Sequence, residues 1–302
     1  MFLLPLRRPR RLLTRWLSAL PLAALSLGCL AQESPRLAPG DRLPATGGVS
    51  QLEGAGGGGL VPWALITGYG TRDQLGGSAY FTSVDTGDFR LDSSGLALGL
   101  FDRVELSYAR QHFNLGDTVP GEKIDMDVFG AKWRLLGDAV FDQDRWWPQF
   151  ALGVQYKRNQ DYALVPKALG AQRDADWDAY LAATKVWLDG PFGRSLLANL
   201  SLRATRGNQM GLLGFGGDRS DRYKLMPEAS LGVFLTDRLV LGAEYRTKPD
   251  NLSAFKEDDF QDAFLAWFPT KWVSVTAAWA GLGNVANKPD QQGWYLSVQL
   301  SH

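Results

Sequence analysis

The chain ends in Gly293-Trp294-Tyr295-Leu296-Ser297-Val298-Gln299-Leu300-Ser301-His302. Every second residue from Trp294 to Leu300 is apolar, and the residues that alternate with them, from Tyr295 to Ser301, are polar. Because successive side chains of a strand point to opposite faces, this stretch predicts a strand with one apolar and one polar face. In a soluble sandwich the apolar face packs into a core. In a transmembrane barrel it meets lipid, and the polar face lines the lumen.

The same alternation recurs upstream and is clearest in the predicted strand over 195–207, where Leu196, Leu200 and Leu202 alternate with Asn199, Ser201 and Arg203. We count about 12 strands from Gly77 to His302, and bacterial barrels have even strand numbers. Short turns such as Phe101-Asp102 and Thr236-Asp237 alternate with long loops. These loops are expected at 114–123, 159–175, 208–221, 248–257 and 283–292.

Aromatic residues near the predicted strand ends, such as Trp133, Trp267 and Trp272, fit the membrane interface. A Greek-key sandwich gives no reason for the alternating loop lengths, whereas outer-membrane barrels have short turns on one side and long loops on the other. The sequence therefore predicts an all-β protein with a single antiparallel up-and-down transmembrane barrel over residues 61–302.

Residues 1–31 have the features of a secretory signal peptide. A basic region precedes the apolar run Trp16 to Leu27, and Cys29-Leu30-Ala31 offers cleavage after Ala31. Lipoprotein processing at Cys29 is the alternative, although Leu is missing three residues before it. Cleavage after Ala31 leaves no cysteine, and so no disulfide and no thiolate metal site. No later stretch reads as a transmembrane helix, so the chain is expected to cross as strands.

Residues 32–60 are predicted to form a periplasmic linker followed by a glycine-rich candidate plug. A phosphate-binding loop is rejected, because Leu60-Val61-Pro62 follows the last glycine where Lys-Ser or Lys-Thr is needed. Glycines let a backbone pass close to other groups, and a segment inside a barrel needs this. We expect 47–70 to lie partly in the lumen or to cap it. A flexible hinge and an extra hairpin at the barrel seam, with a strand at Leu65–Tyr69, are the alternatives. The glycines of the candidate plug are Gly54, Gly56, Gly57, Gly58 and Gly59.

Full charges of both signs stand in the middle of the predicted polar rows. Rings of mixed charge set the selectivity of pores, and here the cations and the acids are expected on opposite sides, as a transverse field. The alternative is a filled barrel in which the same charges pair internally. The predicted lumen-lining residues are Glu105, Lys132, Arg134, Lys157, Lys185, Arg203, Glu228, Glu244 and Arg246.

No catalytic residue is predicted. The histidines are His112 and His302, and the sequence has no Gly-x-Ser-x-Gly element. The acidic residues Asp174, Asp176 and Asp178 lack EF-hand spacing, so a solvated loop is preferred to a Ca²⁺ site. Balanced charge implies no nucleic-acid partner. We expect no enzyme activity, no cofactor and no bound metal. A lipid-modifying enzyme that depends on His112 is a distant alternative.

The stretches Gly48 to Ala55, Leu60 to Ala64, Gly68 to Thr71 and Phe101 to Ser107 resemble an uncharacterised proteobacterial family, domain of unknown function 3034. The resemblance spans the chain after the signal peptide. It implies an outer-membrane β-barrel in a Gram-negative bacterium and brings no activity and no catalytic residues. The terminal His302 departs from the Phe that is common at the end of such barrels.

The sequence thus predicts an outer-membrane β-barrel that acts as a channel or transporter for small solutes. A non-conducting structural or assembly barrel, closed by its N-terminal segment, is the alternative. Expected partners are outer-membrane lipids, lipopolysaccharide and the assembly machinery, which would recognise the C-terminal strand.

Overall fold

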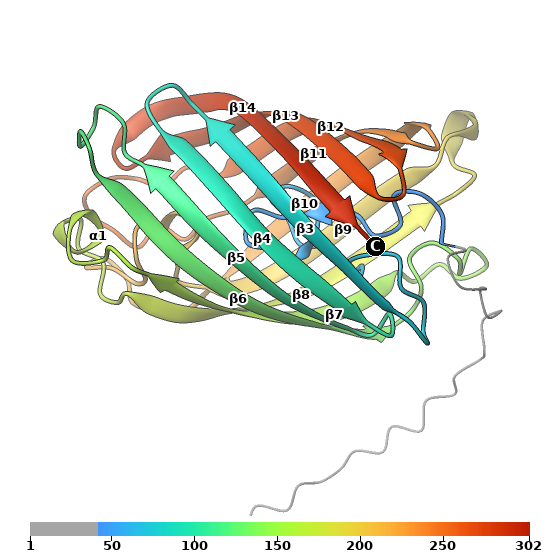
Figure 1. Cartoon of the computed structure of the whole chain (residues 1–302). Coiled ribbons are helices and arrows are strands. Elements are labelled where there is room, and N and C mark those ends of the chain that lie inside the picture. Colours follow the sequence, from blue (N-terminus) through green and yellow to red (C-terminus); the bar gives the residue numbers. More distant parts are fainter. Residues whose placement is uncertain (1–41) are drawn as a thin grey trace, which may run out of the picture. The chain divides into compact units, whose positions relative to one another are not determined.

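Twelve antiparallel strands form a closed barrel in the computed structural model, which describes residues 42–302 (Figure 1). Each strand pairs with its neighbours in the chain, and the last strand closes the barrel on the first, with Leu300 opposite Ala79. The predicted all-β, 12-stranded up-and-down barrel is therefore confirmed. The predicted signal peptide lies outside the described residues.

The barrel strands are 8 to 14 residues long, enough to cross a bilayer when tilted. None of the helices within residues 42–302 is long and apolar enough to cross a membrane. The barrel strands are β3 (Leu75–Asp85), β4 (Arg90–Leu100), β5 (Val104–Asn114), β6 (Lys123–Leu136), β7 (Gln149–Asn159), β8 (Ala175–Trp187), β9 (Leu196–Thr205), β10 (Lys224–Thr236), β11 (Leu239–Arg246), β12 (Phe260–Thr270), β13 (Val273–Val285) and β14 (Lys288–Ser301).

The alternation in the last strand separates lipid from lumen as predicted. On β14 the apolar row, from Trp294 to Leu300, is between 50% and 59% exposed, whereas Tyr295 and Gln299 on the other row are buried. Exposed apolar rows recur on the other strands, for instance Leu196 to Leu202 on β9. These exposed rows form the lipid-facing surface of the barrel.

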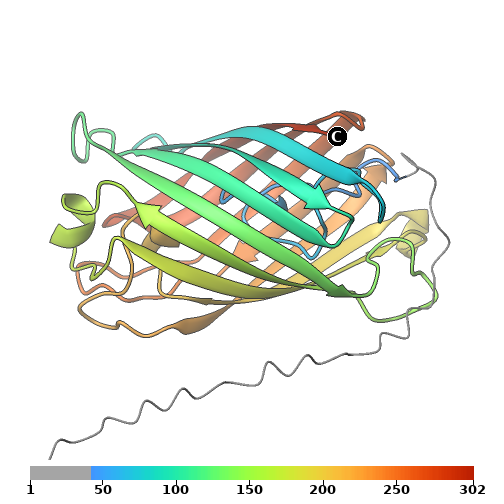
Figure 2. The same cartoon turned by 60° about the horizontal axis from the view of Figure 1, so that its bottom comes forward.

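The two ends of the barrel differ. At the turn end, where β14 ends near His302, most connections are short; the one between β6 and β7 is longer. At the loop end lie the longer connections, which include α1 (Val165–Ala168) and η2 (Asn208–Gly211) (Figures 1 and 2). Two connections at this end are short, residues 86–89 between β3 and β4 and residues 286–287 between β13 and β14. The loop expected at 283–292 is therefore wrong, because β13 and β14 continue and pair up to Val285 and Lys288. The short helix η1 (Pro191–Gly193) forms part of the turn between β8 and β9.

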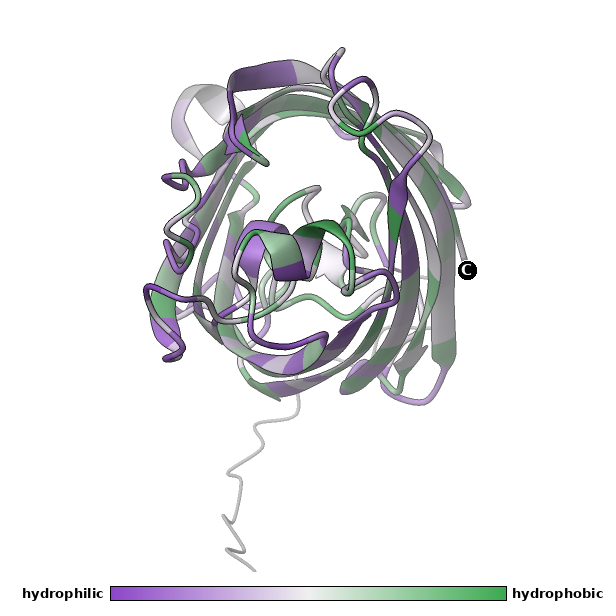
Figure 3. Ribbon diagram, turned by 90° about the vertical axis from the view of Figure 1, so that its left-hand side faces the viewer, coloured by the Kyte–Doolittle hydropathy of each residue, from purple (hydrophilic) through white to green (hydrophobic). Residues whose placement is uncertain are grey.

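Residues 42–74, which we call the lumenal segment, precede the wall and are largely buried. They contain a small hairpin of β1 (Val49–Ser50) and β2 (Gly56–Gly57). Leu65–Tyr69, expected as a strand in the seam alternative, is not a strand but part of this segment, and the wall begins at Leu75. The segment returns to the turn end, where the carbonyl of His302 accepts the N–H groups of Tyr69 and Gly77 at 3.0 and 2.9 Å. Figure 3 shows chain crossing the inside of the ring of strands.

Strand β8 corrects one expectation. Its even-numbered residues face inward, since the Thr184 hydroxyl reaches Ala64 of the lumenal segment at 2.7 Å. Lys185, predicted to line the lumen, therefore belongs to the outward row. It is buried because the turn before β7 covers it, and its ammonium donates to the carbonyls of Asp142 and Arg145. Tyr180 and Ala182, which alternate with Lys185, face inward.

Candidate functional site: the filled lumen

The tip of the lumenal segment, Gln51 to Ala55, reaches across the barrel interior. On one side the carbonyl of Leu52 accepts hydrogen bonds from the Tyr80 hydroxyl at 3.2 Å, the Ser93 hydroxyl at 2.7 Å and the Gln111 amide at 2.8 Å. These donors come from β3, β4 and β5, which are neighbours in the wall. Three converging donors fix the tip against this part of the barrel.

The next residue, Glu53, binds the opposite part of the wall. Its carboxylate is fully buried and pairs with the Lys157 ammonium of β7 and with the Arg246 guanidinium of β11, the latter at 2.8 Å. Arg203 of β9 stands 3.8 Å away. A carboxylate buried without cations would be very unfavourable, so these side chains make the position of Glu53 specific.

The cations around Glu53 are shared with acids of the wall. Arg203 Nε lies 2.6 Å from Glu228, and Arg246 Nε lies 3.2 Å from the same carboxylate. Lys157 also contacts Asp178 at 2.6 Å. The charges thus pair locally instead of facing each other across an open lumen, so the predicted transverse field does not form in this state.

Glu105 on β5 holds the returning strand of the segment. Its two carboxylate oxygens accept the backbone N–H groups of Gly56 at 2.9 Å and Thr67 at 2.8 Å. Lys132 on the neighbouring strand pairs with Glu105 at 3.1 Å and donates to the Gly56 carbonyl at 2.8 Å. Glu105 and Lys132 are both buried, and together they bind the N–H group and the carbonyl group of Gly56.

Glu244 on β11 provides the third attachment. Its carboxylate accepts the Leu60 N–H at 2.7 Å and the Ser230 hydroxyl at 2.7 Å. The Trp63 indole donates to that same hydroxyl oxygen at 2.9 Å. The segment is therefore held at Leu52–Glu53, at Gly56 and at Leu60 by side chains from both sides of the barrel.

The glycine run lies very close to the wall and to the rest of the segment. A Cβ on Gly58 would lie 1.9 Å from Glu244 Oε1, and one on Gly59 would lie 3.1 Å from the Tyr295 ring. A Cβ on Gly57 would meet the backbone of Val61 and Trp63 at 2.6 Å. Only glycine fits these positions without displacing neighbouring atoms. The sequence analysis predicted such a close backbone approach for a segment inside the barrel.

Arg134 faces inward but lies at the turn end, away from these attachments. It donates to the Gly137 carbonyl at 3.0 Å and pairs with Asp102 and, at 2.9 Å, with Asp138. Burial alone would raise the pKa of Asp138, but Arg134 and two backbone N–H groups hold it below its usual value. Arg134 thus braces a turn.

The loop end is closed by a second element, the inward-folded turn at 206–217. The Met210 carbonyl accepts Lys157 at 3.1 Å, and the Leu212 carbonyl accepts Asn159 at 2.7 Å. Nearby, Lys248 and Glu257 form a buried ion pair at 3.1 Å. Burial raises the pKa of Glu257 and lowers the pKa of Lys248, because it disfavours both charged forms.

Most of the predicted lumen-lining residues meet the lumenal segment or its ionic partners, with Arg134 and Lys185 as the exceptions described above. No sequence pattern pointed to Glu53 or to Asp262, which is discussed below. Asp176 and Asp178, expected in a solvated loop, are buried on the inward row of β8, where Asp176 pairs with Arg206. The two acids are two residues apart at the start of a predicted strand, and this spacing could have shown that they lie on the same face.

His112 lies on the outward row of β5, 45% exposed, and its Nδ1 is 2.7 Å from Asp125 Oδ1. Among residues 42–302, no serine hydroxyl is hydrogen-bonded to this ring. Within the same range, no group of three or more His, Cys, Asp and Glu side chains is arranged to hold a metal ion. The described chain therefore offers a His–Asp pair without a positioned nucleophile.

These features define a transmembrane β-barrel whose lumen is filled from within. The chain belongs to the family described as protein of unknown function DUF3034, whose model matches residues 46–299. This confirms the resemblance seen in the sequence. No curated protein matches the chain.

Several solved structures are similar in part. The KdgM porin is 11% identical with a TM-score of 0.47, covering 74% of this chain and 99% of that chain. Omp33, an outer membrane protein of Acinetobacter baumannii, is 10% identical with a TM-score of 0.44, covering 77% and 100%. LpxR from Salmonella typhimurium is 11% identical with a TM-score of 0.42, covering 74% and 99%. Similarity at this level carries no inference about activity.

Proposed function

We propose that this protein is a channel or transporter for small solutes in the outer membrane of a Gram-negative bacterium, closed in the observed state by the lumenal segment. The observation that carries the proposal is the charged interior. Buried ion pairs stabilise a fold less than apolar packing of similar volume does. A barrel meant only to be filled has no need of Glu105, Lys132, Arg203, Glu228 and Glu244 inside it, whereas a lumen that is at times hydrated does.

The arrangement of the lumenal segment supports movement. The twelve strands close on one another without it. Its attachments inside the lumen are side-chain hydrogen bonds and ion pairs, such as those of Leu52 and Glu53, and water can replace such bonds. The backbone bond from Tyr69 to His302 lies at the turn end, where the segment enters the wall. The segment can therefore leave the lumen without breaking the wall.

The test is the conductance of the purified barrel in planar bilayers. The wild type should conduct rarely, whereas Glu53→Gln and a variant lacking residues 47–70 should conduct more often. Glu122→Gln, which removes an exposed acid at the loop end, is the matched control and should behave as the wild type. Folding is checked by the shift in gel mobility on heating.

A folded deletion variant that conducts no ions would overturn the proposal. It would favour the alternative of a permanently closed structural barrel. The expected contacts with lipopolysaccharide and with the assembly machinery, through β14, belong to the same proposal. Fractionation of cells that produce the full chain tests its outer-membrane location.

A further inference from the structure

The lumen has one wall region that is apolar although it faces inward. Along β12, the inward residues Phe260, Phe264, Ala266 and Phe268 are all buried, and Asp262 is the single charged residue among them. Lumen-facing rows of transmembrane barrels are ordinarily polar. In the described chain, the strands β13, β14, β3 and β4 carry no buried charged side chain. We call this inward row of β12 the apolar strip.

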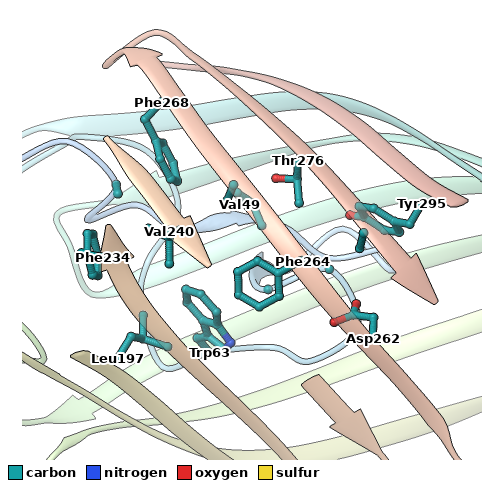
Figure 4. Close-up of a pocket in the computed structure, with 16 residues that line it drawn as sticks. Val49, Trp63, Leu197, Phe234, Val240, Asp262, Phe264, Phe268, Thr276 and Tyr295 are labelled. Carbon is teal, nitrogen blue, oxygen red and sulfur yellow. The ribbon is translucent and has the colours of Figure 1, made fainter. Parts of the chain in front are cut away.

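Two cavities lie along the apolar strip. The first, of about 20 Å³, is nearer the turn end and is lined by Phe234, Val240, Phe264, Phe268 and Trp63 (Figure 4). The second, of about 40 Å³, is nearer the loop end and is lined by apolar side chains that include Leu60, Leu91, Met210 and Phe260. Each has room for no more than a few water molecules.

Tyr295 lines both cavities, and residues of the lumenal segment border each of them. Gly59 is packed against the Tyr295 ring, and Leu60 borders the second cavity. Displacement of the segment would join the two cavities into one apolar path along β12. The charged side of the lumen would keep its own partners, because Arg203 and Arg246 remain paired with Glu228.

Asp262 gives this path one polar feature. It lines the first cavity and is about nine-tenths buried, and its Oδ1 has no hydrogen-bond partner. It stands directly across from Glu244 in the neighbouring strand, but Glu244 is already bound to Leu60 and Ser230. A buried oxygen without a partner is costly, so a hydrogen-bond donor that enters the cavity gains a contact there.

We propose that the passage serves small apolar molecules that carry one hydrogen-bond donor, which move along the apolar strip and bind Asp262 on the way. This rests on the proposed channel function and names its substrate class. An ion gains nothing from the aromatic strip, because Phe264 and Phe268 cannot replace its water. An apolar molecule gains from leaving water.

The test uses N-phenylnaphthylamine, an apolar dye with one N–H group, and intact Gram-negative cells whose lipopolysaccharide excludes it. Dye fluorescence is followed in cells that produce the full chain with Glu53→Gln. Phe264→Gln is then added to place an amide in the strip. Ser107→Gln, which adds the same side chain on the charged side of the lumen, is the matched control. Gel mobility on heating confirms that each variant is folded.

Dye uptake should rise severalfold over cells without the protein. It should fall back with Phe264→Gln and persist with Ser107→Gln, while the ionic conductance of the purified barrels stays alike. Conductance without dye uptake, or equal dye uptake with both glutamine variants, overturns the apolar substrate class and leaves the channel intact. Absence of both conductance and dye uptake in the folded Glu53→Gln protein overturns the proposed function itself.

Discussion

The inward rows of β9 and β12 show two ways of filling one barrel. On β9, Asn199, Ser201 and Arg203 meet the lumenal segment or its ionic partners through hydrogen bonds and ion pairs. On β12, Phe264 and Phe268 border a cavity that the segment leaves partly empty. The polar side fixes the segment through directional hydrogen bonds and ion pairs, whereas the segment packs loosely against the apolar side. The same segment is thus anchored by the polar strands and can separate from β12.

The largest effect is expected from removing a cation of the polar side. Arg203→Met should lower the free energy of unfolding by about 3–5 kcal/mol, because Glu228, Asp178 and Glu53 lose a buried partner. Urea titration in lipid vesicles, followed by tryptophan fluorescence, measures this. Arg158→Met, at an exposed outward position, is the control and should change stability by less than about 0.5 kcal/mol. An equal loss of stability in Arg158→Met would show that the buried ion pairs of Arg203 do not fix the polar side of the lumen.

On the apolar side, Phe264→Ala should cost about 3 kcal/mol, since it enlarges an existing cavity. Its neighbour Leu265 faces lipid, and lipid chains fill the space that Leu265→Ala leaves. That variant should therefore cost only about 1–2 kcal/mol. The same urea titration compares the two. A larger loss at Leu265 would mean that the apolar strip contributes little packing.

A smaller effect is expected where the lumenal segment meets the wall. Gly58→Ala places a methyl group on the Glu244 carboxylate and should destabilise the barrel by about 1–3 kcal/mol. It should also raise the conductance in planar bilayers, because the added methyl group displaces the lumenal segment from its position in the lumen. Gly77→Ala in the wall, where a Cβ has ordinary contacts, is the control. Unchanged conductance in Gly58→Ala would show that the segment adjusts without opening the lumen.

The smallest effect concerns the loop end, where burial raises the pKa of Glu257. A carboxyl with a raised folded-state pKa contributes most stability below its unfolded pKa of about 4.3, and this is lost as pH rises through the folded value. Over that range the free energy of unfolding of the wild type, measured by urea titration, should fall with rising pH more steeply than that of Glu257→Gln, by at most about 1.4 kcal/mol per pH unit. Glu122→Gln should follow the wild type, and parallel curves for all three proteins would contradict the assignment.

Much of the wall could be predicted from alternation alone. The apolar rows of β9 and β14 are complete, so their outward faces are unambiguous in the sequence. Strand β8 was assigned the wrong phase because its rows are mixed: Tyr180 and Ala182 face inward, and Lys185 is on the outward row under a turn. A period of two identifies the two rows of a strand, but it does not say which side a mixed row faces.

Only part of the candidate site could be predicted from the sequence. The run Gly56 to Gly59 indicated a close backbone approach, and the structure shows that approach at Glu244 and Tyr295. The partner of Glu53, by contrast, is 104 residues away in the chain. No local pattern connects Glu53 to Lys157, because their meeting depends on where the segment enters and on how the barrel closes.

By itself, therefore, the sequence determined most of the strands and lipid-facing rows and the need for glycine in one segment, since these follow from local geometry and the sizes of side chains. Tertiary structure alone decided which charges pair, that β12 lines an apolar side of the lumen, and that Oδ1 of Asp262 is left without a hydrogen-bond partner. These depend on strand register and barrel closure, which bring distant residues to the same level of the lumen.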